Sequence, residues 1–155
     1  GWNHAEGAKT KVDEILNISG DLANQDSDAF DLVMASFRMP KSSDEEKGLR
    51  REKIRQATLH AAEVPYNTAV LSLDLLKLLD NLANYGNANA TSDVGVAGLL
   101  ASAACKGALF NVDINLNSLP NEYGQNMRES CPKILAECSV LAREIMQSVK
   151  KRIAE

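Results

Sequence analysis

The hydrophobic residues between positions 12 and 37 recur every three or four residues, which is the spacing of one face of an α-helix. They are Val12, Ile15, Leu16, Leu22, Ala23, Ala29, Phe30, Val33, Met34 and Phe37. Asp26 falls within this stripe, so its carboxylate is expected to point toward whatever the face packs against. An unpaired buried carboxylate is unfavourable, and such a residue normally has a partner or a chemical task. A helix break over residues 24–26, with Asp26 solvated, fits the same pattern, and periodicity alone does not decide between the two.

The first helix is predicted to end near Phe37, because Pro40 disfavours helical backbone at the residue before it. A second helix is expected to begin at Ser43, since Ser43 and Glu46 have the spacing of a capping box. Pro65 is expected to kink or interrupt it.

Three more helices are predicted beyond this point. Residues 66–85 are rich in Leu on nearly all sides, which is typical of a central helix. The next helix is predicted to be capped around Ser92, and its many Gly and Ala residues allow close helix approach. A last helix is expected from about Pro120, bent at Pro132. No alternating strand is found, so the sequence predicts an all-α fold, a bundle of about five long helices in a single domain over residues 1–155.

The composition is that of an ordinary soluble domain, with 45% hydrophobic and 25% charged residues in a chain of 155 residues. The formal net charge of -4 gives no electrostatic reason to expect a nucleic-acid partner. The apolar run over residues 94–110 contains Lys106 and is shorter than a membrane span, so no membrane partner is expected. Three cysteines without a secretory signal favour a reducing, cytoplasmic location.

Few motifs carry chemistry by themselves. The two histidines, His4 and His60, have no spacing typical of a metal site, so no metal is expected. Neither a phosphate-binding loop nor a nucleophile elbow is found. The basic run over residues 47–55 fits either a solvated helix face or an anion-binding surface. Asn111 and Asn115 share a helical face, where a structural hydrogen-bond pair or a C-cap is the simpler interpretation.

Several short motifs nevertheless follow one another in a recognisable order. They are DSDAF at 26–30, FRMPK at 37–41, EEK at 45–47 with Arg50, AEVP at 62–65, GNAN at 86–89, SDVGVA at 92–97, GALFNV at 107–112 and INL at 114–116. In this order and spacing the chain resembles, over nearly its whole length, the cyclodeaminase domain of formiminotransferase-cyclodeaminase and its stand-alone relatives, the methenyltetrahydrofolate cyclohydrolases. That family usually begins with a helix opened by a Pro-Gly-Gly-Gly-Ser-like stretch, and this chain starts after it.

The resemblance implies an all-helical homodimeric enzyme with its active site near the subunit interface and a tetrahydrofolate derivative as substrate. A homodimer is also expected from apolar surface on the helix over residues 73–82. The implied reaction converts 5-formiminotetrahydrofolate to 5,10-methenyltetrahydrofolate and ammonia. The alternatives are a methenyltetrahydrofolate cyclohydrolase using the same pocket, or a non-catalytic folate-binding or dimerisation module.

The resemblance also assigns roles to individual residues. The aspartate proposed for catalysis in the family matches Asp26, the residue that the helical pattern singles out. Residues expected to orient the pterin or the leaving group are Ser92, Asp93, Asn111 and Asn115. Those expected to contact the anionic polyglutamate tail, unless they are simply loop and surface charges, are Arg38, Lys41 and Arg50.

Overall fold

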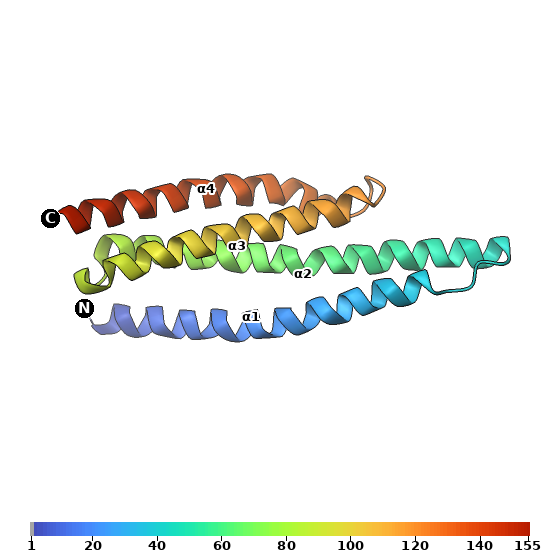
Figure 1. Cartoon of the computed structure of the whole chain (residues 1–155), viewed down its shortest axis with the longest axis horizontal. Helices are drawn as coiled ribbons and strands as arrows, with labels where there is room; N and C mark the ends of the chain where they lie inside the picture. The colour runs from blue at the N-terminus through green and yellow to red at the C-terminus, as the bar shows by residue number, and fades with distance from the viewer. Residues whose placement is uncertain (1) are drawn as a thin grey trace.

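The computed structural model describes residues 2–155, with side chains from residue 7 onward, and this part of the chain is all helical. The helices are α1 (Trp2–Phe37), α2 (Asp44–Tyr85), α3 (Thr91–Asn117) and α4 (Gln125–Ala154), with a short 3₁₀ turn, η1 (Ala88–Ala90), before α3. They run along one long axis, with α2 and α3 between α1 and α4 (Figure 1). The described residues thus form four long helices where the sequence predicted about five.

The missing helix boundary lies at Pro65, which sits inside α2 without ending it. Proline has no N–H for the carbonyl four residues earlier, here that of Ala61. The side-chain amide of Asn115 on α3 donates to this carbonyl at 3.3 Å. The predicted interruption is therefore wrong, and the proline is accommodated by a neighbouring helix.

Two of the predicted helix boundaries are confirmed, and two are wrong. The first helix ends at Phe37, and Ser43 forms the expected capping box with Glu46 at the start of α2. The cap predicted at Ser92 is wrong, because η1 leads directly into α3 and places Ala90 at the N-cap. The start predicted at Pro120 is also wrong, since a turn delays α4 until after Gly124, whose φ of 68° favours glycine.

The main core lies between α2, α3 and α4. Its largest fully buried side chains are Leu76, Leu116, Ile145, Val112, Cys105 and Cys138. Gly98 on α3 faces Ile145 so closely that an added Cβ would lie 3.0 Å from its Cγ2 atom. The small residues of α3 therefore allow the close helix approach that the sequence predicted.

Helix α1 is held differently, because it packs mainly on α2. It buries Ile15, Leu22 and Ala29, whereas Phe30 is 63% exposed and Phe37 is 51% exposed. The helix continues without interruption through residues 24–26, so the predicted alternative of a break there is wrong.

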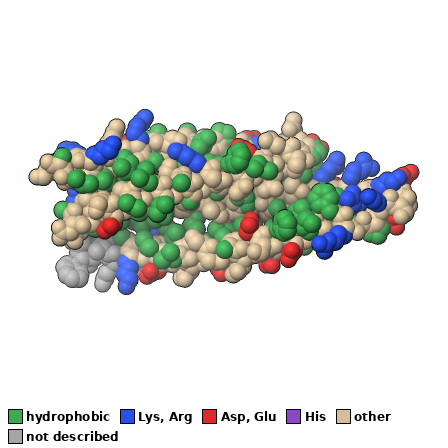
Figure 2. Space-filling model, in the orientation of Figure 1, with side chains coloured by type: hydrophobic (Ala, Val, Ile, Leu, Met, Phe, Trp, Pro, Cys, Tyr) green, Lys and Arg blue, Asp and Glu red, His purple; other side chains and the backbone are tan. Residues whose placement is uncertain are grey.

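Apolar surface remains on α3 rather than on the helix expected to carry it. Leu73, Leu76 and Leu79 are buried, whereas Leu75, Leu78 and Leu82 are half-buried, so little of the surface predicted over residues 73–82 is exposed. The large exposed apolar residues of α3 are Val96, Leu99, Leu100, Phe110 and Ile114. Figure 2 shows hydrophobic side chains along α3 and on the C-terminal part of α1. The stretch Ala88–Asn117 also has the length and hydropathy of a membrane span, properties it shares with the core helices of soluble proteins.

Candidate active site

A cleft of about 410 Å³ lies between α1 and α3, with α2 as its floor. Figure 2 shows a hollow between α1 and the helices above it in that view. The lining residues are Ser19, Leu22, Ala23 and Asp26 of α1, Val64, Pro65 and Thr68 of α2, and Ala104, Gly107, Ala108 and Asn111 of α3. Three helices far apart in sequence therefore bring polar groups to one small space.

Among the side chains that the structure describes, Asp26 is the only acidic one that lines this cleft. It lies beside the stripe through which α1 packs on α2, and it is exposed rather than enclosed. In the described part of the chain its carboxylate has no hydrogen-bond or ion-pair partner. Of the two positions that the sequence left open, the packed one is thus wrong, and the solvated one is observed, although within an unbroken helix. Among the described residues α3 does not close over α1 here, and the carboxylate is accessible to a ligand.

Asn111 lines the wall opposite, on α3. Ala104 and Gly107 share that wall, and their small size leaves the space open. Of the eight site residues predicted from the sequence, the cleft brings together Asp26 and Asn111. An amide can donate and accept hydrogen bonds opposite a carboxylate, which suits a ligand whose ring carries both kinds of group.

Asn115 lies one helical turn after Asn111 and is half-buried. Its amide nitrogen donates to the carbonyl of Ala61 at 3.3 Å and to that of Asn111 at 3.1 Å. The sequence suggested a structural hydrogen-bond role for Asn115, and these two contacts agree with it.

The predicted tail-binding cations lie near the turn between α1 and α2. Arg38 follows Asp26 by twelve residues, which is about 18 Å along a helix. Arg50 donates from Nη2 to the carbonyl of Phe37 at 3.0 Å, and its guanidinium lies 5.6 Å from the centroid of that ring. Its Nε is buried and has no partner in the part of the chain that the structure describes, whereas Arg38 and Lys41 are exposed.

Ser92 and Asp93 lie at the start of α3, in its first turn. Asn111 follows Ser92 by nineteen residues, so the two are separated by about 28 Å of helix. Within one chain these two residues cannot contact a group held between Asp26 and Asn111.

Two hydroxyl groups also line the cleft, and neither was predicted from the sequence. Ser19 donates to the carbonyl of Ile15 at 2.8 Å, and Thr68 donates to that of Val64 at 3.1 Å. Ser19 precedes Asp26 by seven residues, and this spacing was a signal that the two share a helical face.

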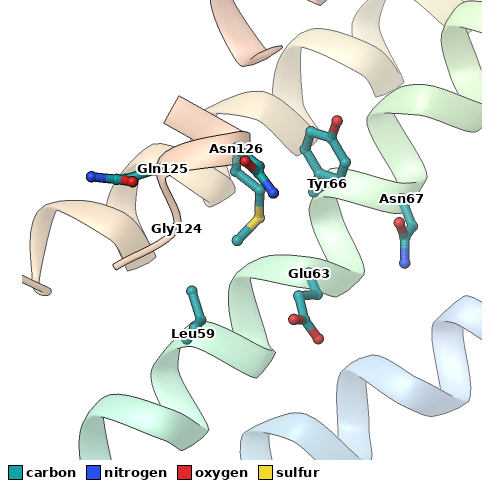
Figure 3. A pocket seen from close by; sticks show the side chains of 8 residues that line it. Leu59, Glu63, Tyr66, Asn67, Gly124, Gln125 and Asn126 are labelled. Atoms are coloured by element: carbon teal, nitrogen blue, oxygen red, sulfur yellow. The ribbon is translucent and has the colours of Figure 1, made fainter. Parts of the chain in front are cut away.

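A second hollow, of about 560 Å³, lies between α2 and the start of α4 (Figure 3). Its residues on α2 include Glu63 and Tyr66, which lie on the opposite side of the helix from Val64 and Thr68. The carboxylate of Glu63 is 2.9 Å from Nδ1 of His60. Although larger, this hollow is separated from Asp26 by α2, so the cleft is the better candidate for the reaction.

The cysteines belong to the core rather than to a site. Burial raises the pKa of the Cys105 thiol to about 12, and the neighbouring Cys138 thiol adds to this shift. Burial also raises the pKa of Cys131. Within the described residues, no group of three or more His, Cys, Asp or Glu side chains is placed to hold a metal ion.

The comparisons with known proteins identify the family. The family model for formiminotransferase-cyclodeaminase matches residues 2–133. The chain belongs to this family.

The relatives include both kinds of folate enzyme. A methenyltetrahydrofolate cyclohydrolase of Methylorubrum extorquens is 34% identical over 129 residues, which are 83% of this chain and 62% of that protein. A formimidoyltransferase-cyclodeaminase of Gallus gallus is 32% identical over 134 residues, 86% of this chain and 25% of that protein. The crystal structure of a formiminotetrahydrofolate cyclodeaminase from Thermotoga maritima matches with a TM-score of 0.64 and 30% identity, over 96% of this chain and 65% of that one. The chain thus spans less than two thirds of each of these family members.

Proposed function

We propose that the cleft between α1 and α3 binds a tetrahydrofolate derivative and converts 5-formiminotetrahydrofolate to 5,10-methenyltetrahydrofolate and ammonia. The observation that carries this proposal is a cleft lined by Asn111 and by Asp26, whose carboxylate has no partner among the described residues, in a chain of the formiminotransferase-cyclodeaminase family. The similarity to a solved formiminotetrahydrofolate cyclodeaminase supports the choice of substrate.

The chemistry requires little more than proton transfer. N10 of the folate attacks the formimino carbon and closes a five-membered ring, and N10 loses its proton. The former imino nitrogen receives that proton and a second one from solvent, and it leaves as ammonia with the electron pair of its bond to carbon. A lone pair of N5 or N10 then forms the C=N bond of the methenyl cation. Asp26 takes the proton from N10 and returns it to the leaving nitrogen, as a general base and then a general acid. Asn111 holds the pterin or the leaving amine by its amide.

A cyclohydrolase is the second candidate, favoured by the 34% identity with the Methylorubrum extorquens enzyme. In that reaction the same carboxylate directs water at the methenyl carbon, so the cleft serves both chemistries. A non-catalytic folate-binding or dimerisation module is the third. Two assays separate these functions: ammonia release from 5-formiminotetrahydrofolate, and loss of the absorbance of 5,10-methenyltetrahydrofolate. Binding of both folates without turnover in either assay would leave the non-catalytic function.

The polyglutamate tail is proposed to extend along α1 toward the turn that precedes α2. Arg38 and Lys41 are exposed there and accessible to its carboxylates, and the guanidinium of Arg50 lies over the ring of Phe37 at the end of α1. Because Arg50 is already bonded to the carbonyl of Phe37, its role is to fix this turn as well as to attract the tail. A tail of several glutamates should then bind more tightly than a monoglutamate, and less so at high salt.

A homodimer is also proposed, through the exposed apolar face of α3. Val96, Leu100, Phe110 and Ile114 are separated by four, ten and four residues, which places them on one face of the helix, and each is more than half exposed. In such a dimer Ser92 and Asp93 join a site only if they approach the cleft of the partner subunit. Sedimentation at micromolar concentration tests the assembly, and Phe110→Glu should shift a dimer to monomer.

A further inference from the structure

The hydrogen bond from Asn115 to Ala61 reaches a backbone carbonyl that has no N–H donor four residues later within α2. Pro65 is four residues after Ala61, so the hydrogen bond that would normally reach the Ala61 carbonyl is missing. An unpaired carbonyl away from water is unfavourable. The amide of Asn115, 54 positions further along the chain, donates to it from α3.

The same bond lies next to the candidate site. Pro65 lines the floor of the cleft, and Asn111, one turn before Asn115, lines its wall. The two donors of the Asn115 amide reach the carbonyls of Ala61 and Asn111. One side chain therefore ties the proline-containing floor to the wall that carries Asn111.

We infer that Asn115 is a positioning residue: paired with Pro65, it fixes the register of α3 on α2 and so sets Asn111 and Gly107 opposite Asp26. This inference rests on the proposed function of the cleft. It replaces the direct substrate contact expected from the sequence, because both amide donors are engaged within the protein. A shift of the wall by an ångström is enough to lower the rate of a reaction that depends on two opposed groups.

The test is a double-mutant cycle between positions 115 and 65, assayed with the folate that the chain turns over. Asn115→Asp keeps the shape and removes both donors, and Asn115→Leu removes them without adding a charge. Either variant should lower kcat about 10-fold or more and leave KM within about 2-fold. Pro65→Ala restores the N–H for the Ala61 carbonyl, so the same substitutions should then lower kcat less than about 3-fold. Asn117→Asp and Asn117→Leu, at an exposed position of α3, serve as matched controls and should leave kcat unchanged.

A spectroscopic readout separates this inference from the proposed function. The backbone amide signals of Thr68 and Ala104, which line the cleft, should shift in Asn115→Leu and shift much less when Pro65→Ala is also present. Wild-type kcat in a folded Asn115 variant, or equal losses in both backgrounds, would overturn the positioning role. If the wild-type chain turns over neither folate, the proposed function fails, and unchanged or equally shifted amide signals would overturn the inference independently.

Discussion

Helix α1 and the three-helix unit of α2, α3 and α4 are built on different principles. The unit encloses a contiguous core, whereas α1 buries Ile15, Leu22 and Ala29 on α2 and leaves Phe30 and Phe37 largely exposed. Yet α1 supplies Asp26, the acidic residue that lines the cleft. The proposed chemistry therefore depends on a helix that contributes little to the main core, while the opposite wall of the cleft belongs to a core helix, α3.

The largest expected effect comes from changing the acid on α1. Asp26→Asn preserves volume but cannot transfer a proton, so turnover should fall by roughly two to four orders of magnitude. The midpoint of thermal unfolding should change little, because the side chain is exposed. Asp28→Asn, at an exposed position two residues later, is the matched control for loss of charge. Unchanged turnover in a folded Asp26→Asn variant would break the assignment of chemistry to α1 and shift it to Asp93.

Equal truncations in the two regions should have unequal effects on stability. Leu76 is fully buried between core helices, so Leu76→Ala should lower the free energy of unfolding by about 2–5 kcal/mol. Leu22 lines the open cleft, so Leu22→Ala leaves no closed cavity and should lower it by only about 1–2 kcal/mol. Urea denaturation measures both. Equal losses would show that α1 is as firmly integrated as the core.

A third prediction concerns the hydrogen bonds by which Arg152 of α4 holds the end of α2. Arg152 donates from Nη1 to the carbonyls of Leu82 and Ala83, and from Nη2 to that of Gly86 at 2.7 Å. Arg152→Ala leaves these carbonyls without that partner and should lower the free energy of unfolding by about 1–3 kcal/mol. Arg152→Lys should recover only part, since a single ammonium cannot span all three. Lys151→Ala, at an exposed neighbouring position, should stay within about 0.5 kcal/mol.

Features set by neighbouring residues could be predicted from the sequence, and features set by contacts between distant helices could not. The predictions were confirmed where the structure depends on residues close together in the sequence. Examples are the capping box of Ser43 and Glu46 and the helix end before Pro40. Pro65 was misread because its compensation comes from Asn115, which no local pattern connects to it.

The candidate site shows the limit more clearly. Periodicity singled out Asp26 but could not say which side of the stripe a neighbouring helix covers, so it left a packed and a solvated position equally open. The motif order suggested that Ser92 and Asn111 act together, although one straight helix holds them about 28 Å apart. Motifs show which residues the members of a family share. Whether those residues lie close together within one chain depends on the fold.

The smallest expected effect is a pH dependence of the free energy of unfolding that arises from Cys105. This thiol lies in the core of α2, α3 and α4, so it reports on that unit rather than on α1. Burial raises the pKa of Cys105 from 9.0 to about 12, so the folded state holds this proton more tightly than the unfolded state does. Its contribution to stability is therefore complete below pH 9 and is lost as the pH rises from 9 toward 12. At pH 10 the loss amounts to about 1 kcal/mol, because only the unfolded thiol has ionised appreciably. Cys105→Ala creates a small void and lowers stability at every pH, but its decline between pH 8 and pH 10 should be shallower than that of the wild type. Parallel declines in the two proteins would mean that another group governs the alkaline loss, and that the core around Cys105 admits the charged thiolate.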